Sequence, residues 1–249
     1  MISYQLYSSR DHGPLSDTLR RLADLGYGAV EGYGALFADA RARDALARGL
    51  SETRLAMPTA HVGFAALESD PGLPRMLNDM GVETVFVPHV APPERPTDAA
   101  GWRAFAVRVE DAGKGVRAAG MRLGWHNHDF EFAPLPDGTV GMDHMLSADL
   151  DWEFDVAWAV RAGADPMDWA RRHGDRVTAV HVKDIAPPGE KADEDGWADP
   201  GTGTMDWAAL AAALSGPVRH WVMEHDKPSD DVRFARAGLA LADRVEAMA

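Results

Sequence analysis

The stretch MRLGWHNHDFEF, residues 121–132, joins a short apolar segment to a dense group of polar side chains. The apolar segment has the length of one buried strand, and it ends in His126, Asn127 and His128, with Glu131 close behind. The same combination, a short apolar run that ends in ionisable residues, recurs along the chain. This recurrence decides the fold prediction.

Eight such runs are predicted as strands, and amphipathic helical patterns lie between them. In one of these patterns, Leu15, Leu19, Leu22 and Leu25 share one helical face, and Gly26 ends the helix. The strands are predicted at residues 2–7, 28–33, 54–60, 83–88, 121–127, 150–155, 176–182 and 217–224.

Eight strand–helix units in 249 residues predict an α/β fold, the (β/α)₈ TIM barrel. An open, doubly wound sheet is the alternative. Because no Gly/Ser linker and no change in composition divides the chain, we predict one domain over residues 1–249.

Composition narrows the possible partners. The chain has no cysteine, so a metal would have to be bound by His, Asp, Glu or carbonyl oxygen. A formal net charge of −14 argues against nucleic acid as a partner, because the phosphate backbone would be repelled. The chain contains no apolar run long enough to predict a membrane span, and its first residues do not have the basic, apolar pattern of an export signal. We expect a cytoplasmic protein that acts on a small molecule.

In a (β/α)₈ barrel the chemistry lies where the strands end, at one face of the barrel. The ionisable residues at or just after the predicted strand ends are Glu31, His61, His89, His126, His128, Glu131, Asp155, His181, Lys183, Glu224, His225 and Asp226. These residues are therefore expected to form a ring around one mouth of the barrel.

Alternation along the strands predicts which side chains face inward. On the fifth strand, Gly124, His126 and His128 are expected inside, and Leu123 and Trp125 outside under the helices.

The sixth strand leaves two alternatives open. Asp155 shares its face with Glu153, so either Glu153 is buried beside a partner or a bulge shifts the register.

Several motifs in order along the chain resemble the sugar phosphate isomerase/epimerase family, which has the xylose-isomerase-like TIM barrel. The motifs are LYSSRD (6–11), LADLGYGAVE (22–31), HNHDFEF (126–132), EFDVAWAVRAGADP (153–166), HVKD (181–184), GTGTMDW (201–207) and MEHD (223–226). They extend over nearly the whole chain.

The resemblance implies one divalent metal bound by two glutamates, an aspartate and a histidine on the last four strands. Asp155, His181 and Glu224 match three of these positions. Glu131 is the expected fourth ligand, if the chain bends back after His128; otherwise His126 or His128 replaces it. Mn²⁺ is the first expectation, with Mg²⁺, Co²⁺ or Zn²⁺ as alternatives, because the ligand types alone do not select among them.

The implied activity is the isomerisation or epimerisation of a small sugar, keto-sugar or polyol derivative, by proton abstraction next to a metal-polarised carbonyl or hydroxyl. Glu131 and Glu224 match the pair that gives and takes the proton, and Lys183 is positioned to stabilise negative charge. Substrate contacts are expected from His61, His89, His126 and His128.

Other functions remain as alternatives. A metal-dependent lyase, similar to inosose dehydratases or to enzymes that eliminate across 3-keto-glycosides, begins with the same proton abstraction. A repair endonuclease of the endonuclease IV type and a sugar-binding barrel without turnover are less favoured. A homo-oligomer is compatible with the family, and the acidic run 190–204 is predicted as a solvated loop or as a rim over the site.

Overall fold

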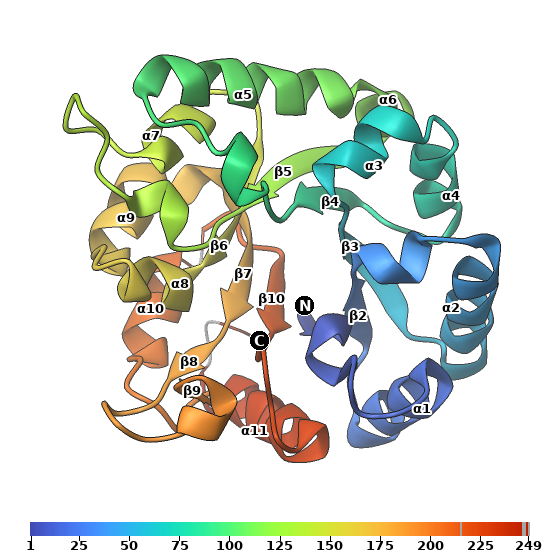
Figure 1. The fold of residues 1–249 in the computed structure, drawn as a ribbon. Helices are drawn as coiled ribbons and strands as arrows, with labels where there is room; N and C mark the ends of the chain where they lie inside the picture. Colours follow the sequence, from blue (N-terminus) through green and yellow to red (C-terminus); the bar gives the residue numbers. More distant parts are fainter. Residues whose placement is uncertain (215, 246–247, 249) are drawn as a thin grey trace.

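The computed structural model describes residues 1–214, 216–245 and 248. Its centre is a closed parallel barrel with the strand order β1-β10-β7-β6-β5-β4-β3-β2 (Figure 1). The barrel strands are β1 (Ile2–Gln5), β2 (Ala29–Gly32), β3 (Ala56–His61), β4 (Thr84–Val87), β5 (Arg122–His126), β6 (Asp151–Asp155), β7 (Val177–Val182) and β10 (His220–Met223). All eight predicted strands are present, and the closed barrel rules out the open sheet.

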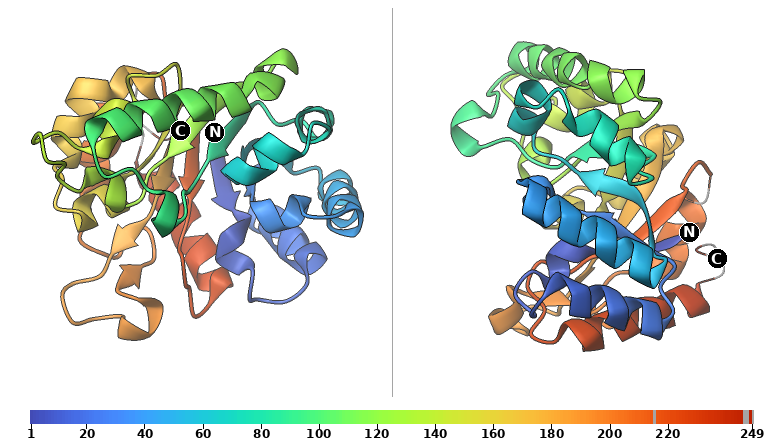
Figure 2. Two further views of the ribbon diagram at one scale, coloured as in Figure 1. Left: turned by 45° about the horizontal axis from the view of Figure 1, so that its top comes forward. Right: turned by 90° about the vertical axis from the view of Figure 1, so that its right-hand side faces the viewer.

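Helices follow the strands and lie on the outside of the barrel in the further views (Figure 2). They are α1 (Leu15–Leu25), α2 (Ala40–Thr53), α3 (Phe64–Ser69), α4 (Leu73–Asp79), α5 (Ala99–Ala112), α6 (Lys114–Ala118), α7 (Gly141–Met145), α8 (Val156–Arg161), α9 (Pro166–His173), α10 (Trp207–Leu214) and α11 (Asp231–Arg244). Gly26 ends α1 with a φ of 106°, a left-handed conformation that glycine adopts without strain.

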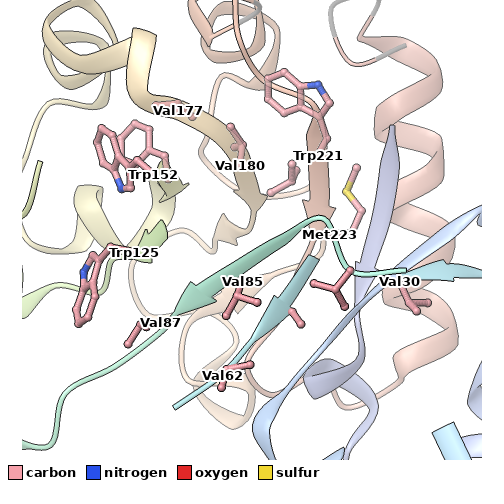
Figure 3. Packing of buried hydrophobic residues seen from close by; sticks show 14 of the residues in the cluster. Val30, Val62, Val85, Val87, Trp125, Trp152, Val177, Val180, Trp221 and Met223 are labelled. Atoms are coloured by element: carbon pink, nitrogen blue, oxygen red, sulfur yellow. The ribbon is translucent and has the colours of Figure 1, made fainter. Parts of the chain in front are cut away.

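The apolar core lies between the strands and the helices. Trp125 and Leu123 point outward from β5, as the alternation predicted, and the Trp125 ring packs edge-to-face on Phe105 of α5 with centroids 5.7 Å apart. Figure 3 shows valines, tryptophans and a methionine of neighbouring strands in this layer. Both faces of each strand are thereby buried, which is typical of parallel barrels.

The inside of the barrel is filled by side chains of a different kind. Gly124 faces inward, and a Cβ at this position would meet the Phe86 ring at 2.5 Å and the Asp151 carbonyl oxygen at 2.7 Å. The lack of a side chain therefore leaves room for Phe86 to fill the lower interior. Above it, towards the strand ends, the interior becomes polar.

Two further features surround the barrel mouth. A short antiparallel pair, β8 (Asp184–Ile185) and β9 (Trp197–Ala198), follows β7 and shapes the connection to α10. The Asp184 carboxylate accepts hydrogen bonds from the backbone amides of Gly201 and Gly203, which fixes this connection. Among the described residues, no helix is long and apolar enough to cross a membrane.

Candidate active site

A cavity of about 590 Å³ opens at the carboxyl ends of the strands. Its lining combines aromatic, basic and acidic side chains, which is the mixture expected for a polar ligand with apolar faces. The lining residues are Tyr7, Arg10, Tyr33, Gly34, His61, Pro88, His89, His126, His128, Trp158, Arg161, Asp195, Trp197, Glu224, Asp226 and Lys227.

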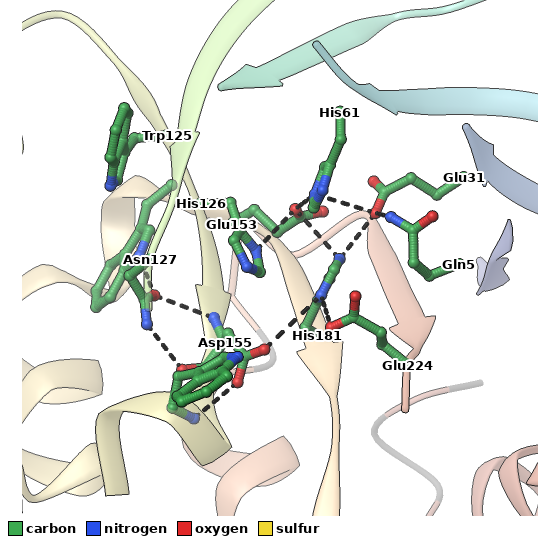
Figure 4. A network of polar contacts seen from close by, with 12 residues as sticks. Gln5, Glu31, His61, Trp125, His126, Asn127, Glu153, Asp155, His181 and Glu224 are labelled. Carbon is green, nitrogen blue, oxygen red and sulfur yellow. Dashed lines mark hydrogen bonds and ion pairs between the residues drawn. The ribbon is translucent and has the colours of Figure 1, made fainter. Parts of the chain in front are cut away.

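Three of the predicted metal ligands meet beside this cavity; of the three, Glu224 lines it, and Asp155 and His181 are buried behind it. Asp155 ends β6, His181 lies on β7 and Glu224 directly follows β10, so that neighbouring strands present them together (Figure 4). The Nδ1 of His181 lies 2.8 Å from Oε2 of Glu224 and 3.9 Å from Oδ2 of Asp155. One donor atom from each residue lies within 4.8 Å of the others, and we call these three residues the outer group.

Lys183 is buried against the outer group. Its Nζ lies 2.7 Å from Glu224 Oε2, 3.0 Å from Asp155 Oδ2 and 3.0 Å from Asp226 Oδ2. Burial alone would lower the pKa of Lys183, but the three carboxylates outweigh it and raise the pKa above its ordinary value. Lys183 is therefore a permanent positive charge beside the outer group.

The outer carboxyl groups respond differently to this environment. Burial would raise the pKa of Glu224, but Lys183 and His181 hold it well below its usual range. Burial raises the pKa of Asp155 to about 6, and Lys183 only partly offsets this effect. Asp155 also caps helix α8, because its carboxylate accepts a hydrogen bond from the Trp158 amide at 2.9 Å.

A second set of polar side chains lies deeper in the barrel. His61, His126 and Glu153, from β3, β5 and β6, meet the Nε2 side of His181, and one donor atom from each lies within 4.8 Å of the others. We call these four residues the inner group. Glu31 of β2 joins them, with its Oε1 2.8 Å from His181 Nε2.

The inner group answers the question that the sixth strand left open. Glu153 is buried with histidine partners and also shares the inward face with Asp155. The pairing of β6 with β7 shifts register between Trp152 and Glu153, so the irregularity is present as well. The first alternative therefore holds: residues two apart on a strand share a face, and the shift lies before Glu153, so it does not separate Glu153 from Asp155.

Glu131 lies apart from these groups. It is in the short 3₁₀ turn Phe130–Phe132 after β5, and its carboxylate accepts hydrogen bonds from Trp125 Nε1 at 3.0 Å and from the His128 amide at 2.9 Å. Burial raises its pKa to about 8. Among the described residues, Glu131 belongs to neither potential metal-binding group and does not line the cavity, so the structure does not bring it together with the other three expected ligands.

The four histidines expected to contact substrate all line the cavity. His128 and His89 form a pair with ring centroids 5.6 Å apart, and burial lowers the pKa of both. His126 is neutral, because burial and the nearby His181 lower its pKa to about 3. For His61, burial would lower the pKa, but two glutamates outweigh it and raise the pKa.

Asn127, between the two histidines of the HNH motif, holds the strand ends in place. Its Oδ1 accepts hydrogen bonds from Trp152 Nε1 at 2.9 Å and from the Asp155 amide at 3.1 Å, and its Nδ2 donates to the Asp155 carbonyl at 3.0 Å. It therefore fixes the backbone of Asp155. Nothing in the sequence pattern singled out this role.

The acidic run 190–204 is anchored rather than merely solvated. Glu194 is buried and accepts hydrogen bonds from Arg233 and from Ser229 of the segment that leads into α11. Trp197 lines the cavity and packs edge-to-face on Trp158, with centroids 4.9 Å apart. The run thus forms one wall of the cavity, in agreement with its alternative interpretation as a rim.

Glu31 and Glu153 are the site residues that sequence reasoning did not identify as such. The sequence identified Glu31 only as an ionisable residue at a strand end. It identified Glu153 only as a carboxylate that alternation places on the same face as Asp155. That placement was the available signal, since a carboxylate on the inner face of a barrel strand requires a partner.

Comparisons with known proteins agree with this architecture. The family model of the xylose isomerase-like TIM barrel matches residues 19–241. A comparison with curated protein sequences finds no match.

Several solved structures have the same fold. A sugar phosphate isomerase/epimerase from Parabacteroides distasonis superposes with a TM-score of 0.79 at 17% identity, over 100% of this chain and 95% of that one. The IOLI protein with a bound zinc atom superposes with a TM-score of 0.73 at 15% identity, over 99% of this chain and 97% of that one. A probable 3-DHS dehydratase from Bacillus anthracis superposes with a TM-score of 0.71 at 11% identity, over 97% of this chain and 98% of that one.

Proposed function

This chain belongs to the xylose isomerase-like TIM barrel family, and we propose that it is a divalent-metal-dependent isomerase or epimerase of a small sugar, keto-sugar or polyol derivative. The observation that carries the proposal is the convergence of Asp155, His181 and Glu224 beside the cavity. Convergent polar groups in a cavity with shifted pKa values are the usual mark of an active site.

The outer group is suited to a divalent cation. Two carboxylates and one imidazole offer oxygen and nitrogen donors that Mn²⁺, Mg²⁺, Co²⁺ and Zn²⁺ all accept, and Mn²⁺ is our first choice. The zinc atom in the IOLI structure, which has the same fold, supports a metal in this kind of barrel. When bound, such a cation polarises a substrate carbonyl or a pair of hydroxyls and so makes the neighbouring C–H more acidic.

Residues of the chain supply the other steps of the proposed reaction. We assign proton abstraction to Glu224, which lines the cavity and whose low pKa keeps it ionised as a base. Lys183, 2.7 Å from Glu224, stabilises negative charge that develops on the substrate oxygen. The substrate hydroxyls are held by His61, His89 and His128, and Trp158 and Trp197 close off the apolar side of the cavity.

The fourth ligand and the second proton carrier were expected at Glu131. The hydrogen bonds of its carboxylate to Trp125 and to the His128 amide support a different role. We propose that Glu131 shapes the chain after β5 and thereby directs His128 into the cavity. His126, which lies beside His181 with centroids 4.5 Å apart, is then the fifth-strand residue best placed to contact a metal or the substrate.

A lyase on the same scaffold is the second candidate, because one structure with the same fold is a probable dehydratase. Both reactions begin with loss of a proton next to a carbonyl, so the outer group serves either. They differ in whether a group leaves the substrate afterwards.

The test is incubation of the metal-loaded protein with keto-sugars and polyol ketones in D₂O, followed by NMR. Isomeric products with deuterium at the exchanged carbon support the isomerase, whereas loss of water or of an aglycone supports the lyase. If the metal-loaded protein neither exchanges deuterium into any of these compounds nor converts them, both candidate activities are contradicted. A sugar-binding barrel without turnover is then favoured.

A further inference from the structure

The inner group has the composition of a metal site of its own. His61, His126, Glu153 and His181 come from four different strands, and Glu31 adds a fifth. All five side chains are buried or nearly so, with His61 the most exposed at 7%. Figure 4 shows them on the side of His181 that faces away from Glu224.

The donor atoms converge on one point. The Glu153 Oε2 atom contacts three imidazole nitrogens: His61 Nε2 in a short hydrogen bond, His126 Nδ1 at 3.2 Å and His181 Nε2 at 3.2 Å. Glu31 Oε1 lies 2.8 Å from His181 Nε2 and 3.3 Å from His61 Nε2. Ligands around a tetrahedral metal with bonds of about 2.0–2.1 Å are about 3.3 Å apart, so these separations approach those of a metal coordination shell.

Several buried atoms of this cluster lack a partner. Glu153 Oε1 and Glu31 Oε2 make no hydrogen bond with any described residue, and His126 Nδ1 has only the 3.2 Å contact with Glu153. An unsatisfied buried polar atom destabilises the folded protein, and a buried carboxylate does so more strongly unless a cation compensates its charge. Protons shared with His61 and His181 compensate the charge, but they leave these atoms unpaired.

We propose that the inner group, with Glu31, is a second divalent-metal site, separate from the outer group and richer in nitrogen. Three imidazoles and carboxylate oxygens suit Zn²⁺ or Co²⁺ better than Mg²⁺ or Mn²⁺. His181 faces the outer group through Nδ1 and the inner group through Nε2, so it is the residue that the two sites share. A cation reaches the inner group from the cavity, which His61 and His126 line.

Binding at the inner site exchanges protons for metal. The protons that His61 and His181 share with Glu31 and Glu153 leave as the cation enters, because a ligating imidazole nitrogen needs its lone pair. With an ion at the outer group as well, His181 also gives up its Nδ1 proton to solvent and bridges the two ions as an imidazolate. The inner metal then supplies the positive charge that keeps both carboxylates ionised inside the barrel.

The test uses the whole chain, stripped with a chelator, reloaded with Co²⁺ and freed of excess metal. Cobalt per chain is measured by elemental analysis, and the visible spectrum reports its coordination. The matched variants are Glu153→Gln and Asp155→Asn, two carboxylates on one strand that each become the amide of equal size. His61→Phe is a second inner variant, and circular dichroism verifies that each variant folds.

We expect two cobalt ions per chain in the unaltered protein. Glu153→Gln and His61→Phe should each retain one and lose the part of the spectrum that comes from the nitrogen-rich site. Asp155→Asn should retain that part and lose the other ion. A different result would overturn the inference: the unaltered protein binds one ion per chain, Asp155→Asn removes it, and neither inner variant affects it. That result leaves the proposed function intact.

The opposite result separates the two proposals. If the protein binds one ion, both inner variants abolish its binding and Asp155→Asn does not, the inner site is supported. The outer group then binds no metal, which contradicts the metal centre of the proposed function. No bound cobalt in the unaltered protein contradicts both. Should Glu153→Gln fail to fold, His61→Phe alone decides between these outcomes.

Discussion

The Nζ of Lys183 lies 2.7 Å from Oε2 of Glu224, and both side chains are buried at the mouth of the barrel. The same ammonium lies 3.0 Å from Asp155. Lys183 therefore neutralises carboxylates that the proposed metal also needs, so the ammonium and the metal compete for the same negative charge.

Replacing Lys183 by Met should destabilise the metal-free protein by about 3–5 kcal/mol, because removal of one partner leaves the others as uncompensated buried charges. Added Mn²⁺ should recover part of this loss, since the cation replaces the missing charge. Thermal or urea unfolding with and without Mn²⁺ measures both effects. Lys227→Met is the matched control, because the pair of Lys227 with Asp195 is more than half exposed and contributes about 0–1 kcal/mol.

Asp155→Asn should abolish metal-dependent turnover. Loss of a residue that only orients a metal ligand costs about 10–100-fold in affinity or activity, so loss of a ligand should cost more than about 100-fold in kcat/KM. Treatment with a chelator should have the same effect on the unaltered protein, and Mn²⁺ should restore it. Asp151→Asn, at the other end of β6, should leave turnover unchanged. Equal activity of Asp155→Asn and the unaltered protein would contradict the metal site.

Glu131 should make stability depend on pH. Burial raises the pKa of Glu131 to about 8 from its ordinary value of 4.5, so the folded protein holds the proton over a range in which the unfolded chain has released it. The stability that the neutral carboxyl contributes is complete below about pH 4.5 and is lost as the pH rises towards 8, at about 1.4 kcal/mol per pH unit.

Glu131→Gln cannot ionise and removes this dependence. Urea unfolding of both proteins from pH 5 to pH 8 should show that the free energy of unfolding of the unaltered protein falls relative to that of the variant. A constant difference across this range would mean that Glu131 is already ionised at pH 5. Taking the difference between the two proteins cancels the other groups that titrate in the same range.

Gly124→Ala should destabilise the barrel by roughly 1–3 kcal/mol or more, because the added methyl group meets the Phe86 ring and the Asp151 backbone inside a closed strand layer. Gly28→Ala is the control, since no atom lies within 4 Å of a Cβ at that position, and its effect should remain within about 0.5 kcal/mol. Thermal unfolding of the two variants compares them directly. Equal stability of the two would show that Phe86 moves aside at little cost.

The sequence by itself determined the fold and most of the strand ends. The alternation of eight apolar runs with amphipathic helices is a local property, and hydrophobic burial acts on it in the same way wherever the runs are placed. The outward side of Trp125 followed from side-chain alternation, and the common direction of parallel strands placed Asp155, His181 and Glu224 at one mouth of the barrel. The family resemblance singled out these three as a set.

Only the tertiary structure decided how the polar side chains divide between the two groups. Glu153 meets three histidines that come from three other strands, and Glu131 turns to Trp125 because the chain bends after His128. Register shifts and bends of one residue depend on packing between distant strands, so their energies are not encoded in any short stretch. The sequence therefore placed the ionisable residues at the strand ends, and the packing of the barrel decides which carboxylates lie together.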